Sequence, residues 1–304
     1  MTDYSLRTPV VLLTFNRPET TEAVFAEIAK AEPSKLLVVS DGPRADHPGE
    51  EEKVAMARSV IGRVNWDCDV STNFSDVNLG AKIRISSGLD WAFSQVPEAI
   101  ILEDDCVPDQ TFFRFCQELL DVYRHDQRVG MISGDNFQFG RRRNQDSYYF
   151  SRYGHIWGWA TWHDRWVGCY DVNMSKWPRI RDEGWINDLV GSKKEAGYWQ
   201  RIFERTYRGD FDAWDYQWVF TNWIEGRASI VPAVNMISNI GFNKDATHTT
   251  GASDIANLPR VPSSFPLKHP IGRFKNMEAD EFSYHKCFGI PLLKRVSNKL
   301  AGGF

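Results

Sequence analysis

The sequence predicts an α/β fold in which a mostly parallel sheet is flanked by helices. The first half of the chain alternates short apolar runs with segments of helix length. Several apolar runs end in polar or acidic residues, as strands do at the ligand-binding edge of a parallel sheet. The chain has 304 residues, of which 42% are hydrophobic and 25% charged, so it can bury a sizeable core.

The alternation is regular up to residue 133. Apolar or alternating runs predict strands at 9–15, 35–42, 68–74, 99–105 and 129–133. The segments between them predict helices at 19–31, 50–61, 78–93 and 109–126. The first of these helices is favoured by Pro18, because proline is well tolerated at a helix start. Strands separated by such helices indicate βαβ units.

The second half of the chain loses this alternation. Residues 141–149 are predicted to form a polar loop. Helices are expected near 186–190, 198–207 and 212–226, with a strand inside 228–242. Residues 247–283 are rich in Pro, Ser, Asn and His, which favours an extended or mobile segment. Ten of the twelve tryptophans lie between Trp157 and Trp223, where a core of large side chains is the first explanation and a surface for a sugar ring the second.

Charge and composition exclude several classes of protein. A net charge of -4 argues against a general nucleic-acid binder. The sequence shows no signal peptide and no apolar run as long as a membrane span. The five cysteines are scattered and form no CxxC pair, so we expect reduced thiols and a cytoplasmic protein. The basic amphipathic segment 290–304 is read first as a solvated helix end, and a weak peripheral contact with an anionic membrane is the alternative.

Three adjacent acids, Glu103, Asp104 and Asp105, end one of the apolar runs. Buried like charges usually need a cation, and Mg²⁺ or Mn²⁺ binds carboxylate, phosphate and water oxygens. Neighbouring side chains of an extended strand point to opposite faces, so the three acids cannot all reach one ion. We expect Asp105 to bind the metal, and Glu103 and Asp104 to contact nucleotide groups or order the loop. The alternative is a helix cap, which Asp109 would supply best. A cap explains one acid, but it does not explain the three acids at the end of the apolar run.

Polar residues also follow the first two predicted strands: Thr14, Asn16, Arg17 and Asp41. At the start of a helix, the Arg17 guanidinium and the free N–H groups would both attract a phosphate. Lys82 and Arg84, after a turn, could serve the same diphosphate, although one of them is expected to be only solvated. A cation, an acid for the nucleoside and an acid cluster on one sheet edge are what a nucleotide diphosphate needs.

These motifs resemble a glycosyltransferase of the A-type nucleotide-sugar fold. The likeness is greatest to the N-acetylglucosaminyltransferase I family, within the family 2-like superfamily, and runs from about residue 10 to residue 248. The matching segments are VLLTFNR, VVSDG, EDDCVPDQTFF, IWGWATW, AWDYQW and KDATHTTG. The EDD segment and the Trp-Asp pair are the specific parts.

The resemblance implies a set of residue functions. It places Arg17 against the phosphates, Asp41 at the uridine, Asp215 as the catalytic base and His248 on a closing loop at the metal. Arg84 stands where the family has a base-contacting histidine, which is a departure from the pattern.

For the remaining candidate residues, a purely structural explanation stays open beside the functional one. Asp215 is either an acid in a partly dry aromatic pocket that deprotonates an acceptor hydroxyl, or a helix cap or arginine partner, and Asp212 competes with it. His248 is either an exposed loop residue or part of a closing loop. Trp157 and Trp159, in the acceptor-side turn, and Asp212 are the expected contacts of the acceptor or sugar.

The sequence therefore predicts a metal-dependent, inverting hexosyl- or N-acetylhexosaminyltransferase. Its donor would be a nucleoside diphosphate sugar, expected to be a UDP-sugar, and its acceptor a carbohydrate or glycolipid in surface polysaccharide or glycolipid synthesis. Residues 1–246 would form the domain, with a nucleotide half at 1–135 and an acceptor half at 136–246, and 247–304 a loop and tail packing on it. The alternatives are a nucleotidyltransferase, disfavoured because LLTFNRPE lacks glycine, and a non-catalytic nucleotide- or carbohydrate-binding protein.

Overall fold

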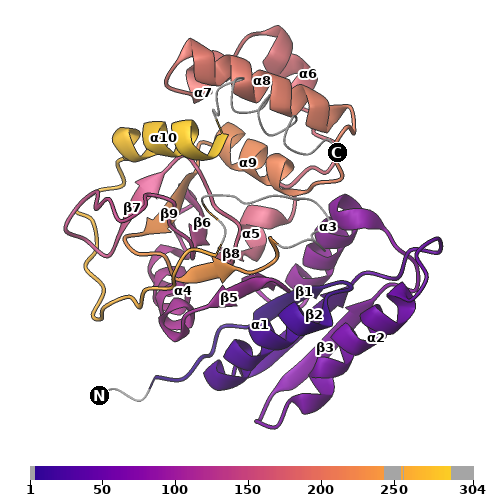
Figure 1. Ribbon diagram of the computed structural model, residues 1–304. Coiled ribbons are helices and arrows are strands. Elements are labelled where there is room, and N and C mark those ends of the chain that lie inside the picture. Colours follow the sequence, from indigo (N-terminus) through magenta and orange to yellow (C-terminus); the bar gives the residue numbers. More distant parts are fainter. Residues whose placement is uncertain (1–3, 243–254, 256, 289–304) are drawn as a thin grey trace, which may run out of the picture.

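The five strands predicted in the first half of the chain all belong to one central sheet (Figure 1). The computed structural model describes residues 4–242, 255 and 257–288. The sheet has eight strands in the order β3-β2-β1-β4-β8-β6-β9-β7. Their bounds are β1 Val10–Thr14, β2 Lys35–Ser40, β3 Asp69–Phe74, β4 Glu98–Glu103, β6 Val129–Ser133, β7 Tyr148–Ser151, β8 Trp159–Trp162 and β9 Ala228–Pro232. The predicted α/β fold, a large sheet flanked by helices, is confirmed.

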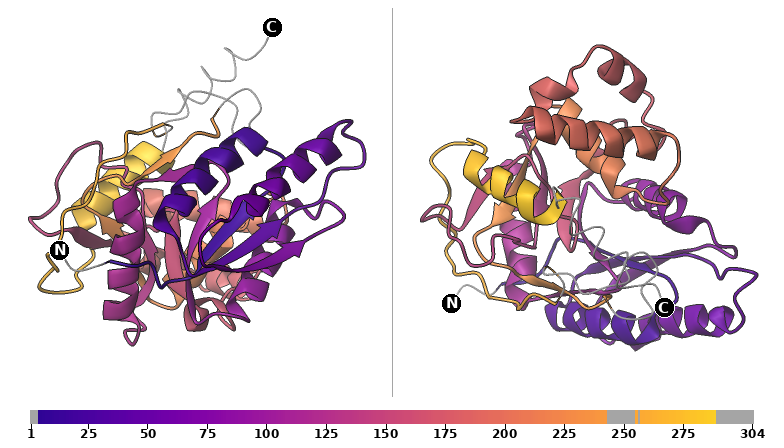
Figure 2. Two further views of the ribbon diagram at one scale, coloured as in Figure 1. Left: turned by 90° about the horizontal axis from the view of Figure 1, so that it is seen from below. Right: turned by 45° about the horizontal axis from the view of Figure 1, so that its top comes forward.

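Helices cover both faces of this sheet (Figures 1 and 2). In the described residues they are α1 Pro18–Ala31, α2 Glu50–Ser59, η1 Val60–Arg63, α3 Gly80–Phe93, α4 Gln110–Tyr123, α5 His163–Trp166, α6 Trp177–Asp182, α7 Ile186–Leu189, α8 Lys193–Tyr207, α9 Asp215–Ile224, α10 Met277–Ser283 and η2 Tyr284–Phe288. A separate two-stranded sheet pairs β5 Cys106–Pro108 with β10 Ile237–Asn239.

The sheet is mixed, with two strands, β8 and β7, that run against the others. Strands β3, β2, β1 and β4 run parallel, whereas β8 is antiparallel to both β4 and β6. Strand β9 is parallel to β6, and β7 closes the order as an antiparallel neighbour of β9. Strands β7 and β8 could not be predicted from the sequence, because both have four residues and lie in segments without alternation.

The core lies on both faces of the sheet. Along β1, Val10 and Leu12 contact the core under α1 and α4, while Val11 and Leu13 contact the core under α3 and α9. Successive side chains of a strand point to opposite faces, so a strand covered on both sides must be apolar throughout. All five residues of β1 are buried, as the run VVLLT predicted.

The tryptophans mainly fill the core. Trp159 stacks on Trp214 with ring centroids 5.5 Å apart, and Trp177 and Trp199 belong to a separate cluster among the helices that follow β8. Helices α6, α7 and α8 form the layer at the top of Figure 1, packed over α9. No helix in the described ranges is long and apolar enough to cross a bilayer.

The strand expected inside 228–242 is confirmed as β9, whereas the expectation that 247–283 is extended throughout is wrong in part. The segment 228–242 forms two strands in different sheets, because β9 joins the central sheet and β10 pairs with β5. The segment 247–283 contains helix α10, whose N-cap Asn276 accepts a hydrogen bond from Ala279 N. The chain before α10 runs beside β7, where Asn276 N donates to Phe150 O at 2.7 Å.

Close packing of α3 on β2 gives a test of the fold. A Cβ added at Gly88 would lie 2.4 Å from Val39 Cγ1, so Gly88→Ala should lower the free energy of unfolding by about 1–3 kcal/mol, measured by urea unfolding. Gly197→Ala is the matched control in α8, where the nearest atom lies at 3.7 Å. Better helix propensity should make the control up to about 1 kcal/mol more stable. Equal effects of the two variants would contradict the close contact.

Candidate functional site

The strand order reverses between β1 and β4. Strands β2 and β3 lie on one side of β1, and β4 lies on the other. The carboxyl ends of β1 and β4 therefore flank a topological switch point. In open α/β sheets, ligands bind at such a point, outside the carboxyl ends of the strands. Two cavities open there, of about 310 Å³ and about 610 Å³.

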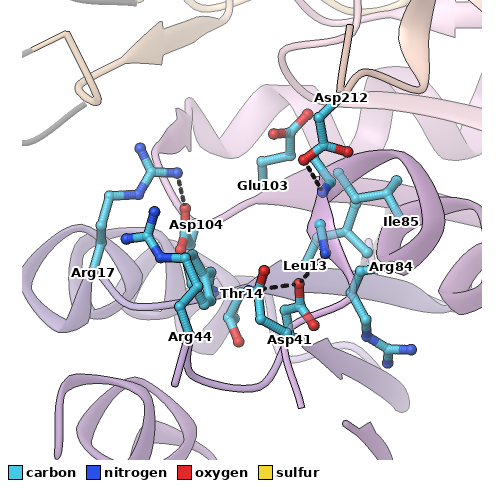
Figure 3. A pocket seen from close by; sticks show the side chains of 14 residues that line it. Leu13, Thr14, Arg17, Asp41, Arg44, Arg84, Ile85, Glu103, Asp104 and Asp212 are labelled. Atoms are coloured by element: carbon cyan, nitrogen blue, oxygen red, sulfur yellow. Dashed lines mark hydrogen bonds and ion pairs between the residues drawn. The ribbon is translucent and has the colours of Figure 1, made fainter. Parts of the chain in front are cut away.

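The smaller cavity, the first cavity below, lies over the ends of β1 and β2 and the start of α3 (Figure 3). Its lining is Leu13, Thr14, Phe15, Arg17, Asp41, Arg44, Asn78, Gly80, Ala81, Arg84, Ile85, Glu103, Asp104 and Asp212. Thr14 Oγ1 and Arg84 Nε are buried without a hydrogen-bond partner among the described residues. Buried polar atoms are normally paired, so these two groups indicate a site for a polar ligand.

The larger cavity, the second cavity below, continues from the first toward α9. It shares Arg17, Ala81, Ile85, Glu103 and Asp212 with the first cavity. Its other lining residues are Asp105, Ile156, Trp157, Asp210, Phe211, Ala213, Trp214, Asp215, Tyr216, Asn239, Gly241 and Phe242. A ligand that fills both cavities would therefore pass Glu103 and Asp212.

Arg17 neutralises the acids at the end of β4. Its Nη1 lies 2.8 Å from Asp105 Oδ2, and its Nη2 forms an ion pair with Asp104. Asp104 also accepts from Phe15 N at 3.1 Å, which ties the end of β1 to the end of β4. Burial alone would lower the pKa of Arg17, but the two carboxylates outweigh it and raise that pKa. The predicted phosphate-binding arginine thus has carboxylate partners of its own.

The acids of the triplet differ in their environments. Burial, with the negative charges of Asp105 and Asp104, raises the pKa of Glu103 well above its usual range. Burial also raises the pKa of Asp104, although Arg17 opposes that rise. No hydrogen bond or ion pair from another described residue holds the Glu103 carboxyl, which lines both cavities. The Glu103 carboxyl is therefore placed to contact a ligand in either cavity.

Asp41 orders the beginning of α3. Its carboxylate accepts from Gly42 N at 2.9 Å, Leu79 N at 2.9 Å and Gly80 N at 3.1 Å, and from Asn78 Nδ2 at 3.1 Å. Burial raises the pKa of Asp41, while the backbone N–H groups act against that rise. Asp41 lines the first cavity as predicted, but much of its hydrogen-bonding capacity is used within the protein.

Asp212 caps α3 from the opposite side. Its two oxygens accept from Ala81 N and Lys82 N, each at 2.9 Å. Gly80 has φ +76°, and a Cβ there would lie 2.8 Å from the Asp212 carboxylate, so the contact requires glycine on both counts. Asp212 was predicted to contact the acceptor or sugar. In the structure it forms the wall between the cavities and fixes the loop that precedes Asp215.

Three predicted residues lie outside the two linings. The Asn16 amide donates to Glu50 Oε1 at 2.7 Å, and the Lys82 side chain lines neither cavity. Trp159 has no exposed surface and is a core residue, so its expected contact with a sugar is corrected. Trp157 is only partly buried and lines the second cavity. His248 lies outside the described residues.

Sequence reasoning missed Arg44, which lines the first cavity. Its guanidinium carbon lies 5.6 Å from the centre of the Phe15 ring, and its backbone N donates to Glu50 Oε2 at 2.7 Å. Glu50 also binds Asn16, so these residues link the loop after β2 to the end of β1. The one signal in the sequence that could have identified Arg44 is its place in VVSDGPR, because an arginine shortly after the end of a strand can face a ligand.

The residues at the switch point can supply a divalent cation with carboxylate oxygens. In the parts of the chain that the structure describes, no group of three or more His, Cys, Asp or Glu side chains is arranged to hold a metal ion. The expected protein ligands are Asp105 and His248, with phosphate and water completing the shell, and Asp105 lines the second cavity. Arg17 already lies 2.8 Å from Asp105 Oδ2, so a cation would have to share this carboxylate with the guanidinium.

No family model matches the chain, and no curated protein matches it. Among solved structures, HddC from Yersinia pseudotuberculosis is similar with 12% identity and a TM-score of 0.33, over 52% of this chain and 77% of that chain. Mouse xyloside xylosyltransferase 1, apo form, is similar with 11% identity and a TM-score of 0.34, over 71% of this chain and 81% of that chain. UDP-glucose pyrophosphorylase complexed with UDP-glucose gives 10% identity and a TM-score of 0.27, over 49% and 63%. Likeness at this level does not transfer an activity.

The link between Glu50 and Arg44 predicts a pH-dependent stability. Burial would raise the pKa of Glu50, but hydrogen bonds from Arg44 and Asn16 lower it to about 2. A carboxyl whose pKa is lower in the folded protein stabilises it above the unfolded pKa, near 4.3, and this stabilisation is lost as the pH falls toward 2. Glu50→Gln should therefore cost about 2 kcal/mol at neutral pH, and progressively less below about pH 4.

Urea unfolding of the wild type and Glu50→Gln over this pH range measures the effect. Glu51→Gln is the matched control, because Glu51 is exposed in the same first turn of α2. A loss of stability in Glu50→Gln that stays constant down to acid pH would contradict the ionic contribution.

Proposed function

We propose that the protein is a metal-dependent glycosyltransferase that moves a sugar from a nucleoside diphosphate sugar to an acceptor hydroxyl. The observation that supports this best is the pair of adjoining cavities at the switch point. They meet at Glu103, with arginines in the first cavity and Asp215 in the second. A donor nucleotide and an acceptor need such neighbouring sites, with the reacting atoms at their junction.

The donor would occupy the first cavity. Asp41 would shape its nucleoside end through the loop that it orders, while Thr14 and Arg84 offer unpaired polar atoms. Arg17 and Arg44 provide positive charge for the diphosphate. Mg²⁺ or Mn²⁺ held by Asp105 would stabilise negative charge on the departing diphosphate. The preference for uridine rests on the resemblance of the segment VVSDG.

The acceptor would occupy the second cavity. Trp157, Phe211, Tyr216 and Phe242 give it aromatic walls, which suit the apolar faces of sugar rings. Asp215, at the start of α9, would remove the proton of the attacking hydroxyl, and one such displacement inverts the anomeric carbon. Glu103, between the cavities, would hydrogen-bond the transferred sugar.

The remaining features of the proposal follow the family resemblance. The sugar would be a hexosyl or N-acetylhexosaminyl group, and the acceptor a carbohydrate or glycolipid of a cell-surface polymer. Residues 1–246 would act as one transferase domain, with the donor cavity in its first half and α9 in its second half.

The metal and Asp105 can be tested by calorimetric titration of UDP in Mn²⁺ and in EDTA. The wild type should bind UDP more tightly with Mn²⁺. Asp105→Asn should lose this metal-dependent gain and keep its binding in EDTA, because Arg17 is then released from one carboxylate. Asp67→Asn, on an exposed acid away from both cavities, is the control. An equal metal-dependent gain in Asp105→Asn would exclude Asp105 as the ligand, and no UDP binding in either condition would argue against a UDP-sugar donor.

Asp215→Asn tests the assignment of the base. Replacing the carboxylate should lower the turnover of sugar transfer about 10²–10⁴-fold, because the amide cannot accept the proton, and leave the affinity for donor nucleotide near that of the wild type. Transfer would be measured by release of the nucleoside diphosphate, with Asp188→Asn, on an exposed acid of α7, as the control. Full activity of Asp215→Asn together with inactive Asp212→Asn would assign the base to Asp212 instead.

A further inference from the structure

The three most exposed large apolar side chains in the described residues lie within one stretch of seven residues. Ile271 is 105% exposed, Phe274 84% and Met277 72%, and the next most exposed is Val77 at 62%. They border a groove of about 420 Å³ between this stretch and the segment that enters β7. This surface is separate from the two cavities at the switch point, with which it shares no lining residue.

Ile271 and Phe274 project from a loop that is held at both ends, and Met277 follows this loop as the first residue of α10. Residues 268–276, the 268–276 loop, form the lower-left margin of the molecule in Figure 1. At its start, Ser147 N donates to Lys268 O at 2.9 Å, and at its end Asn276 N donates to Phe150 O at 2.7 Å. Arg273, near its middle, forms an ion pair with Asp126. The loop is therefore fixed, yet it presents its apolar side chains to the solvent.

The position of Phe274 within the loop is also set by packing. A Cβ at Gly272 would lie 2.6 Å from the Phe274 ring, so the ring rests directly on the backbone of its own loop. Exposed apolar surface is unfavourable in water. Packing on Gly272 leaves the outer face of the Phe274 ring in water. That unfavourable exposure is removed only when a membrane or another molecule covers the ring.

The charges of the loop itself are basic, although Asp146 lines the same groove and the exposed Glu278 follows Met277. Residues 267–277 carry Lys268, Arg273 and Lys275, with His269 and no acid, although acids outnumber Lys and Arg in the whole chain, 40 to 36. Lys268 and Lys275 are exposed residues near the two ends of the loop, although partial burial lowers the pKa of Lys275. The nearby carboxylate of Asp126 is already paired with Arg128 and Arg273. The loop therefore complements an anionic partner.

We propose that the 268–276 loop is a membrane-binding surface, at which Ile271 and Phe274 enter the acyl boundary of an anionic lipid bilayer. Lys268 and Lys275 contact the lipid headgroups. Single apolar side chains that project between lysines suit a bilayer, which takes up each one separately while the charges stay at the headgroups. A protein partner would instead need a larger surface of matching shape. The proposal is independent of the transferase activity and of the C-terminal segment 290–304.

Co-sedimentation of the full chain with lipid vesicles tests this surface. The wild type should bind vesicles of phosphatidylcholine and phosphatidylglycerol in equal parts, bind pure phosphatidylcholine vesicles far less, and lose binding as salt rises. Phe274→Ser should weaken binding about tenfold or more. Met277→Ser should weaken it less, since Met277 lies at the edge of the loop, and Met56→Ser is the matched control on an exposed methionine of α2. Lys268→Glu with Lys275→Glu should remove the preference for anionic vesicles.

Three outcomes would overturn the proposal. The first is no binding of the wild type to either vesicle. The second is binding that Phe274→Ser leaves unchanged, above all if replacement of Lys294, Arg295 and Lys299 abolishes it, because the C-terminal segment would then make the contact. The third is self-association of the wild type that Phe274→Ser abolishes without a change in vesicle binding, which would make this surface an interface between two copies. Phe274 is mostly exposed, so unchanged thermal unfolding of the variant would exclude loss of the fold.

Discussion

The Arg17 guanidinium between two carboxylates allows β4 to end inside the protein. Strand β4 lies in the middle of the sheet, and its acids cannot be buried there without compensation. The structure supplies it from a helix start, where Pro18 begins α1 directly after Arg17. On the side of Gly241 the packing is tight, because a Cβ there would lie 2.1 Å from Asp105 Oδ2. Charge and space at this point limit what else can bind.

A second constraint concerns the start of α3. The first backbone N–H groups of a helix have no acceptor within the helix. Here the carboxylates of Asp41 and Asp212, from the two halves of the chain, accept hydrogen bonds from them. The same contacts separate the two cavities and fix the approach to α9. Both acids therefore have structural partners, and their contacts with a ligand stay predictions.

The first half of the fold could be predicted from the sequence because β1, β2 and β4 are covered on both faces and read as unbroken apolar runs. Strand β6 was also found. Strands β7 and β8 were not, because four residues show no period and their partners are distant in the chain. The acid triplet identified the site for a related reason, since charge at the end of a buried strand is unusual. Asn16 and Trp159 could not be judged, because Glu50 and Trp214 become their neighbours only in the folded chain.

The 268–276 loop also has a consequence for the sheet itself. Strand β7 is the last strand of the central sheet, and its outer side would present unpaired backbone groups to any passing chain. The bridge between Phe150 and Lys275, and the bonds at the two ends of the loop, occupy part of that side. The segment that presents apolar side chains outward thus also blunts an aggregation-prone edge. Shortening the loop would remove the exposed apolar side chains but would leave the edge of β7 open to pairing with another chain.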